Sequence, residues 1–196
     1  MAEAITALDS PIDVMYPLHK ALRAEAASAE ASVRGLDIGA SVAPFEPIFQ
    51  RWATALEYHA VVEDRYMTAL LDRPSARTNE AEHKHLTELL GDLQAYLRAL
   101  AESAPVTART RRHLLGKVVA LRVAQDDHLE EEEERILPVI RQQLSVAQQF
   151  DMAQRLLVAP EAHQAHWILD WLTPHVTATE RQLLAALALG SASVSP

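Results

Sequence analysis

Residues 128–138 read His-Leu-Glu-Glu-Glu-Glu-Glu-Arg-Ile-Leu-Pro, a histidine followed by five glutamates and a short apolar stretch. His128 and Glu132 are four positions apart, so on a helix they share one face, with Cβ atoms about 5–6 Å apart. One imidazole and one carboxylate placed in this way can bind the same metal ion or two adjacent ions. Five consecutive glutamates always supply a partner at that spacing, however, and an acidic run is more often a solvated helix face.

A second histidine–glutamate pair has the same spacing. Residues 59–64 read His-Ala-Val-Val-Glu-Asp, so His59 and Glu63 also share a helix face. The two pairs lie in different amphipathic segments of a small acidic chain. Together they predict a binuclear metal site between helices.

The composition favours an all-helical protein. The 196 residues fit one helical domain with a sizeable core. Apolar residues make up 49% of the chain, aromatic residues 5%, and there are only five glycines, a profile more typical of helical than of β-rich proteins. The chain has no cysteine, which excludes disulfides, zinc ribbons and iron–sulfur clusters. Any bound metal must therefore be held by His, Glu and Asp.

Charge and hydropathy limit the partners. The formal charge of −9 argues against a nucleic-acid partner, because phosphates select a basic face. The first residues lack the basic and apolar regions of a signal peptide, and no apolar run approaches the roughly 20 residues that span a bilayer. We therefore expect a soluble cytoplasmic protein that binds neither nucleic acid nor a membrane.

Four long segments carry apolar residues at intervals of three and four, as on the inward faces of helices. The first is expected to run from about residue 10 to residue 33, with a kink at Pro17 or a start one turn later. The second covers about 47–71, where Pro74 marks its end. Asn79 with a glutamate three positions on predicts an N-cap for the third, and Thr107 starts the fourth. Four such helices predict an all-α, up-down four-helix bundle.

The remaining signals divide the chain into a bundle and smaller parts. We expect a bundle at residues 10–143 and an extension of short helices at 144–190 that packs on it. Ser145 and Thr177 have the spacing of N-caps for two of these short helices. The expected tails are residues 1–9 and 191–196.

The histidines offer one imidazole from each long helix. His19 lies in the apolar stripe of the first helix, and His59 and His128 belong to the pairs above. In the third helix, His83 and His85 are about 200° apart around the axis, so only one of them can point inward, and the leucine stripe does not decide between them. Four imidazoles with two carboxylates that can bridge suit iron or manganese better than zinc, which prefers four-coordinate sites.

These residues resemble the hemerythrin-like, or HHE cation-binding, family over about residues 10–140. The resemblance rests on LHKALR around His19, YHAVVEDRYMTALL around His59, EHKHLTELL around His83 and HLEEEEERILPVI from His128. The alternative ferritin-like pattern requires Glu-x-x-His on two helices, and here it occurs on the third helix alone. In the HHE family the third-helix ligand stands three residues before an apolar position, which favours His83.

The resemblance implies a ligand set and a cofactor. The terminal ligands would be His19, His59, His83 and His128, and the bridges would be Glu63 and Glu132. The cofactor would be two iron ions, joined by these carboxylates and by an oxo or hydroxo bridge. Glu131, Glu133 and Glu134 are expected to lie off the His128 face and mostly in water. Asp64 is expected to matter less for metal binding than Glu63, in the same way.

The chain departs from the oxygen-carrying hemerythrins at two positions. Those proteins have a histidine four residues after the third-helix ligand and an aspartate five residues after the last-helix histidine, where this chain has Thr87 and Glu133. The paired His-x-x-x-Glu pattern is more similar to the bacterial di-iron repair proteins and the iron-sensing ubiquitin-ligase domain. We expect a non-haem di-iron protein whose centre reacts with or senses O2, peroxide or nitric oxide. An iron-stabilised interaction module and a catalase-like enzyme are the alternatives.

Overall fold

The structure is a computed structural model that describes residues 9–101, 105–158 and 167–189, so most of the two expected tails lies outside it. It is all-helical, as predicted. The long helices are α1 (Met15–Arg34), α2 (Glu46–Tyr66), α3 (Arg73–Ala101) and α4 (Ala108–Glu131). The shorter ones are η1 (Pro11–Val14), η2 (Thr68–Leu70), a π-helical turn (Glu132–Ile136), α5 (Leu137–Gln143), α6 (Val146–Leu157), α7 (Trp167–Leu172), η4 (Thr173–His175) and α8 (Ala178–Ala188).

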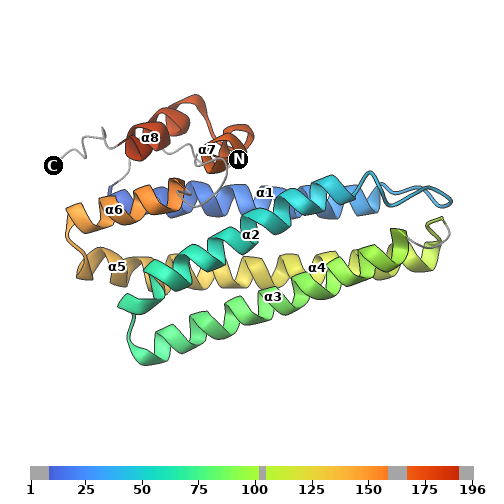
Figure 1. Ribbon diagram of the computed structural model, residues 1–196, viewed down its shortest axis with the longest axis horizontal. Coiled ribbons are helices and arrows are strands. Elements are labelled where there is room, and N and C mark those ends of the chain that lie inside the picture. The colour runs from blue at the N-terminus through green and yellow to red at the C-terminus, as the bar shows by residue number, and fades with distance from the viewer. Residues whose placement is uncertain (1–8, 102–104, 159–166, 190–196) are drawn as a thin grey trace.

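The four long helices run up and down beside one another, which confirms the predicted bundle (Figure 1). α4 packs against both α1 and α3, and α1 also packs against α2. The first helix begins one turn later than Pro11, so that Pro17 falls in the first turn of α1, where a missing N–H costs little. Thr107, Ser145 and Thr177 are N-caps whose side chains accept hydrogen bonds from the backbone, as predicted.

The start of α3 differs from the prediction. The helix begins at Arg73 rather than after Asn79, because the Asp72 carboxylate accepts a hydrogen bond from the Ser75 backbone N–H at 2.8 Å and so caps the first turn. Pro74 therefore does not mark the end of the second helix but lies in the first turn of the third, where proline is favoured. Asn79 is buried inside α3 and donates a hydrogen bond to Thr68 Oγ1 at 3.1 Å.

The core of the bundle consists of two apolar clusters with a polar layer between them. The loop-end cluster lies toward the α1–α2 and α3–α4 connections. It includes Leu22, Val33, Phe45, Trp52, Leu56, Leu86, Leu93, Leu114, Leu121 and Leu129. The extension-end cluster lies toward α5 and the C-terminal helices. It includes Ile12, Met15, Leu18, Val62, Met67, Ile136, Ile140, Met152, Leu156, Ile168 and Leu184.

The helices after α5 pack on the outside of the bundle, against η1, α1 and α2 (Figure 1). Ion pairs join the two parts: Lys20 to Glu180 at 3.1 Å and Glu25 to His175 at 3.0 Å. The division of the chain into a bundle domain and an extension stays a prediction. Within the described ranges, no helix combines the length and the apolar character needed to cross a bilayer.

Candidate metal centre

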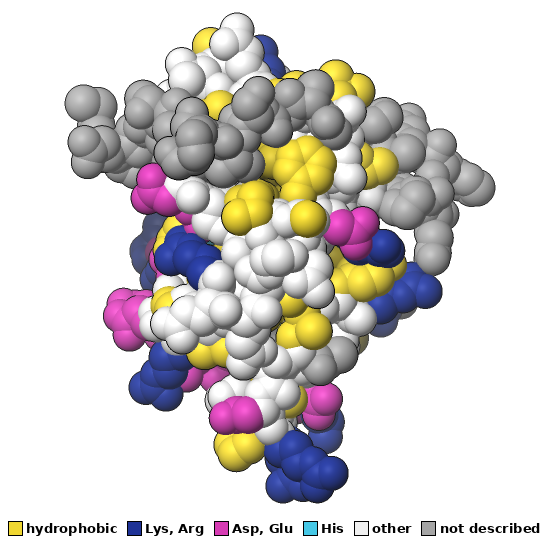
Figure 2. Space-filling view, turned by 90° about the vertical axis from the view of Figure 1, so that its left-hand side faces the viewer, with side chains coloured by type: hydrophobic (Ala, Val, Ile, Leu, Met, Phe, Trp, Pro, Cys, Tyr) yellow, Lys and Arg dark blue, Asp and Glu magenta, His cyan; other side chains and the backbone are white. Residues whose placement is uncertain are grey.

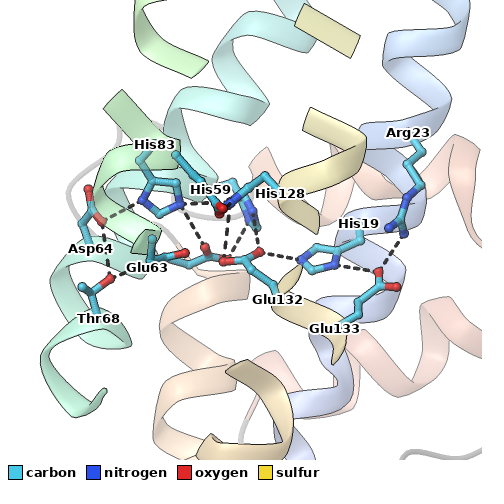
Figure 3. Close-up of polar contacts among 12 residues, drawn as sticks. His19, Arg23, His59, Glu63, Asp64, Thr68, His83, His128, Glu132 and Glu133 are labelled. Atoms are coloured by element: carbon cyan, nitrogen blue, oxygen red, sulfur yellow. Dashed lines mark hydrogen bonds and ion pairs between the residues drawn. The ribbon is translucent and has the colours of Figure 1, made fainter. Parts of the chain in front are cut away.

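The six side chains named from the sequence meet in the polar layer between the two apolar clusters (Figure 3). Their nitrogen and oxygen atoms form two groups, and the ligand atoms of each group lie within 4.8 Å of one another. Both groups contain Glu63 and Glu132. The other members are His19 and His59 in one group and His83 and His128 in the second. All six are buried, and no histidine is visible among the described side chains on the end face in Figure 2.

Glu132 is the centre of this arrangement. Its Oε2 atom lies 3.4 Å from His19 Nε2 and 3.3 Å from His59 Nε2, and its Oε1 atom lies 3.6 Å from His128 Nε2. Glu63 stands opposite, with Oε2 at 3.4 Å from His83 Nε2. Each carboxylate therefore faces imidazoles from more than one helix, which is the geometry that a bridging ligand requires.

The structure separates the two third-helix candidates. His83 is buried, and its Nε2 atom lies 3.1 Å from Nε2 of His128. His85 is exposed on the surface between α3 and α4. The inward position thus belongs to His83, in the same phase as the buried Leu86.

A π-helical turn sets the direction of the glutamates that follow His128. α4 passes into this turn at Glu132, and the turn ends just before Pro138. The Leu137 N–H donates to the Glu132 carbonyl, five residues back, so this turn is wider than an α-helical turn. In the wider turn, the residues four and five positions after His128 lie on the same side of the helix. Glu132 and Glu133 therefore both reach His19 on α1.

Three further, outer carboxylates contact the imidazoles at Nδ1, on the side away from the centre of the cluster. Their role was not apparent from the sequence. Asp64 Oδ1 lies 2.7 Å from His83 Nδ1, and Glu82 Oε2 lies 3.0 Å from His128 Nδ1. A carboxylate at Nδ1 fixes the orientation of the ring and leaves Nε2 free for a metal. Asp64 thus contacts a member of the cluster, which the sequence did not indicate. It remains partly exposed, but it belongs to the site.

Glu133 is the third outer carboxylate. Its Oε1 atom lies 2.8 Å from His19 Nδ1 and accepts a hydrogen bond from Arg23 Nη1 at 2.7 Å. The expectation that Glu133 is solvated is wrong, because the sequence gives no sign of the π turn that redirects it. Glu134, the next residue, is exposed as expected.

Within the described part of the chain, six inward atoms of the cluster have no hydrogen bond of good geometry. The unpartnered atoms are His19 Nε2, His59 Nε2 and both carboxylate oxygens of Glu63 and of Glu132. If each Nδ1 donates its proton to its outer carboxylate, the facing Nε2 atoms of His83 and His128 both present lone pairs at 3.1 Å. Buried polar groups without partners are costly, and a cation between them removes that cost. The donor set therefore fits a buried cation site, and its two ligand groups are compatible with a pair of metal ions.

The pKa values show how strongly these groups interact. Burial by itself lowers the pKa of His59, but the charge of Glu63 and the contact with Glu132 raise it to about 10. Burial raises the pKa of Glu132, yet the imidazoles around it, His128 above all, hold that pKa well below its usual range. The Glu132 carboxylate thus stays ionised in the core, which is the state that binds a metal.

The other described histidines, His85, His113 and His175, do not join the cluster. His113 stacks on Tyr96 with ring centroids 4.7 Å apart, and His175 pairs with Glu25. His163 and His166 lie outside the described residues.

Comparison with family models gives one result for this chain. The model described as "Hemerythrin HHE cation binding domain" matches residues 10–140. Comparison with curated proteins and with solved structures gave no match. The matched range contains the four long helices and every member of the buried cluster, and it covers the region where the sequence resembles this family. The chain belongs to the hemerythrin HHE cation-binding domain family.

Proposed function

We propose that this protein holds two iron ions in the polar layer and that the centre reacts with a small molecule, either O2, peroxide or nitric oxide. The terminal ligands in this proposal are His19, His59, His83 and His128. Glu63 and Glu132 are the bridges. The proposal is supported above all by the two groups of four ligand atoms that share both carboxylates.

The donor set favours iron over zinc. Each group contains two imidazoles and two carboxylates, and the carboxylates are common to both groups. Zinc commonly takes closed tetrahedral sites with separate ligands, whereas octahedral N/O sites with open positions are typical of non-haem iron. When bound, two irons would supply a redox-active pair with an open position for a small ligand.

The residues of the chain prepare this site in three ways. The Nε2 atoms of His19, His83 and His128 point inward because outer carboxylates bind their Nδ1 atoms. Glu63 and Glu132 place two carboxylates in a buried layer of the bundle. The loop-end and extension-end clusters pack on either side of the layer along the bundle, and so hold the four helices around it.

Purified protein should contain two irons per chain, one for each group of ligand atoms. Elemental analysis after expression in iron-replete medium measures this content. An optical spectrum recorded before and after addition of peroxide or nitric oxide then shows which of them reacts. Stoichiometric zinc without iron, or a preparation without any metal, would contradict the proposal. Sustained release of O2 from peroxide would identify catalase-like turnover at the same centre.

A further inference from the structure

The two halves of the centre differ in the charge that surrounds them. We name them by their helices: the α3–α4 position lies between His83 and His128, and the α1–α2 position lies between His19 and His59. Both positions share the same two buried glutamates, so any difference in their affinity for a cation must come from the residues behind the imidazoles.

At the α3–α4 position, both imidazoles carry an outer carboxylate. Asp64 binds His83 and Glu82 binds His128 through their Nδ1 atoms. Among the residues that the structure describes, no lysine or arginine forms an ion pair with either carboxylate. Arg77 lines the same surface hollow as Glu82, but in the described part of the chain the ion pair of Glu82 is with His128. Two negative charges therefore remain beside this position, reduced only by their partial exposure to water.

At the α1–α2 position, the balance is different. Glu133 binds His19 Nδ1, but the same oxygen also contacts the Arg23 guanidinium at 2.7 Å. The arginine offsets the charge of this carboxylate. The Nδ1 atom of His59 lies 2.9 Å from Glu63, a residue of the centre itself, rather than from an additional outer acid.

Access to the two positions differs as well. A hollow of about 500 Å³ opens between α3 and α4, and His128 and Glu82 are part of its lining. The imidazoles themselves are all buried, from 0% exposed at His19 to 5% at His59, so the difference in access lies in this hollow. A cation that arrives from this hollow meets the more negative position first.

We propose that the two positions fill in order: a divalent cation binds first and more tightly at the α3–α4 position, and the second binds at the α1–α2 position. This inference rests on the proposed function, because it requires a centre with two metals. The physical cause is that uncompensated outer carboxylates make the imidazoles more basic and attract the cation, whereas the outer carboxylate behind His19 is neutralised by Arg23.

The test is a titration of the metal-free full-length protein with Co²⁺, which reports binding in its visible absorption without a change of oxidation state. Wild-type protein should bind two equivalents with separate dissociation constants. Glu82→Gln should weaken the tight step by roughly 10–100-fold, as for other partners of metal-bound histidines, and Asp64→Asn should act in the same way. Glu133→Gln should weaken the other step and leave the tight one unchanged. Glu134→Gln, an exposed change in the same acidic run, serves as the control.

The possible results distinguish a failure of ordered filling from a failure of the two-metal centre. Binding of a single equivalent, or of none, by wild-type protein would overturn the two-metal function itself. Two equivalents with equal affinities would overturn only the ordered filling. The same holds if Glu133→Gln weakens the tight step, or if the Glu82 and Glu133 variants weaken both steps equally. Circular dichroism of each metal-free variant shows whether it is folded. If Glu82→Gln is not folded, Asp64→Asn decides, because that side chain is 45% exposed.

Discussion

Glu132→Gln should lose most of the bound metal and lower the melting temperature of the loaded protein, whereas Glu134→Gln should leave both nearly unchanged. Glu132 has no exposed surface and contacts three imidazoles from three helices. The amide has the same shape, but it removes one negative charge from both metal positions and places N–H donors against the imidazoles. Loss of one partner from a buried charged network costs about 3–5 kcal/mol, and an exposed charge change usually costs less than about 0.5 kcal/mol.

Elemental analysis and thermal melts of both variants, with and without a chelator, measure this contrast. The chelator matters because the effect on melting should be largest in the loaded protein. Glu133 is not a suitable control, since its carboxylate binds His19 and Arg23. Equal losses in Glu132→Gln and Glu134→Gln would mean that the glutamate run is only an acidic surface, and the two-metal proposal would fall.

His83→Ala should reduce the metal content from two ions per chain to one or none, and His85→Ala should retain both. The first substitution removes an imidazole that faces His128 and Glu63 inside the bundle. It also removes the imidazole that contacts Asp64. The second changes an exposed side chain two positions away, on the other side of the helix.

The same elemental analysis, combined with circular dichroism to verify folding, measures the difference between the two histidine variants. His85 lines the hollow above His128, so a modest change in the rate of metal uptake is compatible with the proposal. Retention of metal in His83→Ala together with its loss in His85→Ala would show that His85 is the ligand.

Local spacing explains which parts of the site could be predicted from the sequence. His59 with Glu63 and His128 with Glu132 are recognisable because a helix puts residues four apart on one face, and helical phase then brings in His19. Spacing did not choose between His83 and His85. That choice depends on how α3 is rotated against α4, and before the structure only the family resemblance favoured His83.

The outer carboxylates could not be predicted because each contact joins separate helices. Asp64 reaches from α2 to α3, and Glu82 reaches from α3 to α4. Glu133 also requires the π turn, which local sequence does not show. The misplaced start of α3 has a similar cause. Two N-cap signals compete in that segment, and the hydrogen bond from Ser75 to Asp72 prevails over the capping pattern at Asn79.

The polar layer has a consequence for how the protein unfolds. The loop-end and extension-end clusters are each large enough to hold helix ends together, and the layer between them contributes six polar side chains instead of apolar contact. A bound metal pair ties all four helices at that level, so both clusters should open in one cooperative transition. Without metal the link is weak, and one cluster can open while the other stays closed. In the two-metal proposal, metal occupancy would thus set the cooperativity of unfolding as well as the stability.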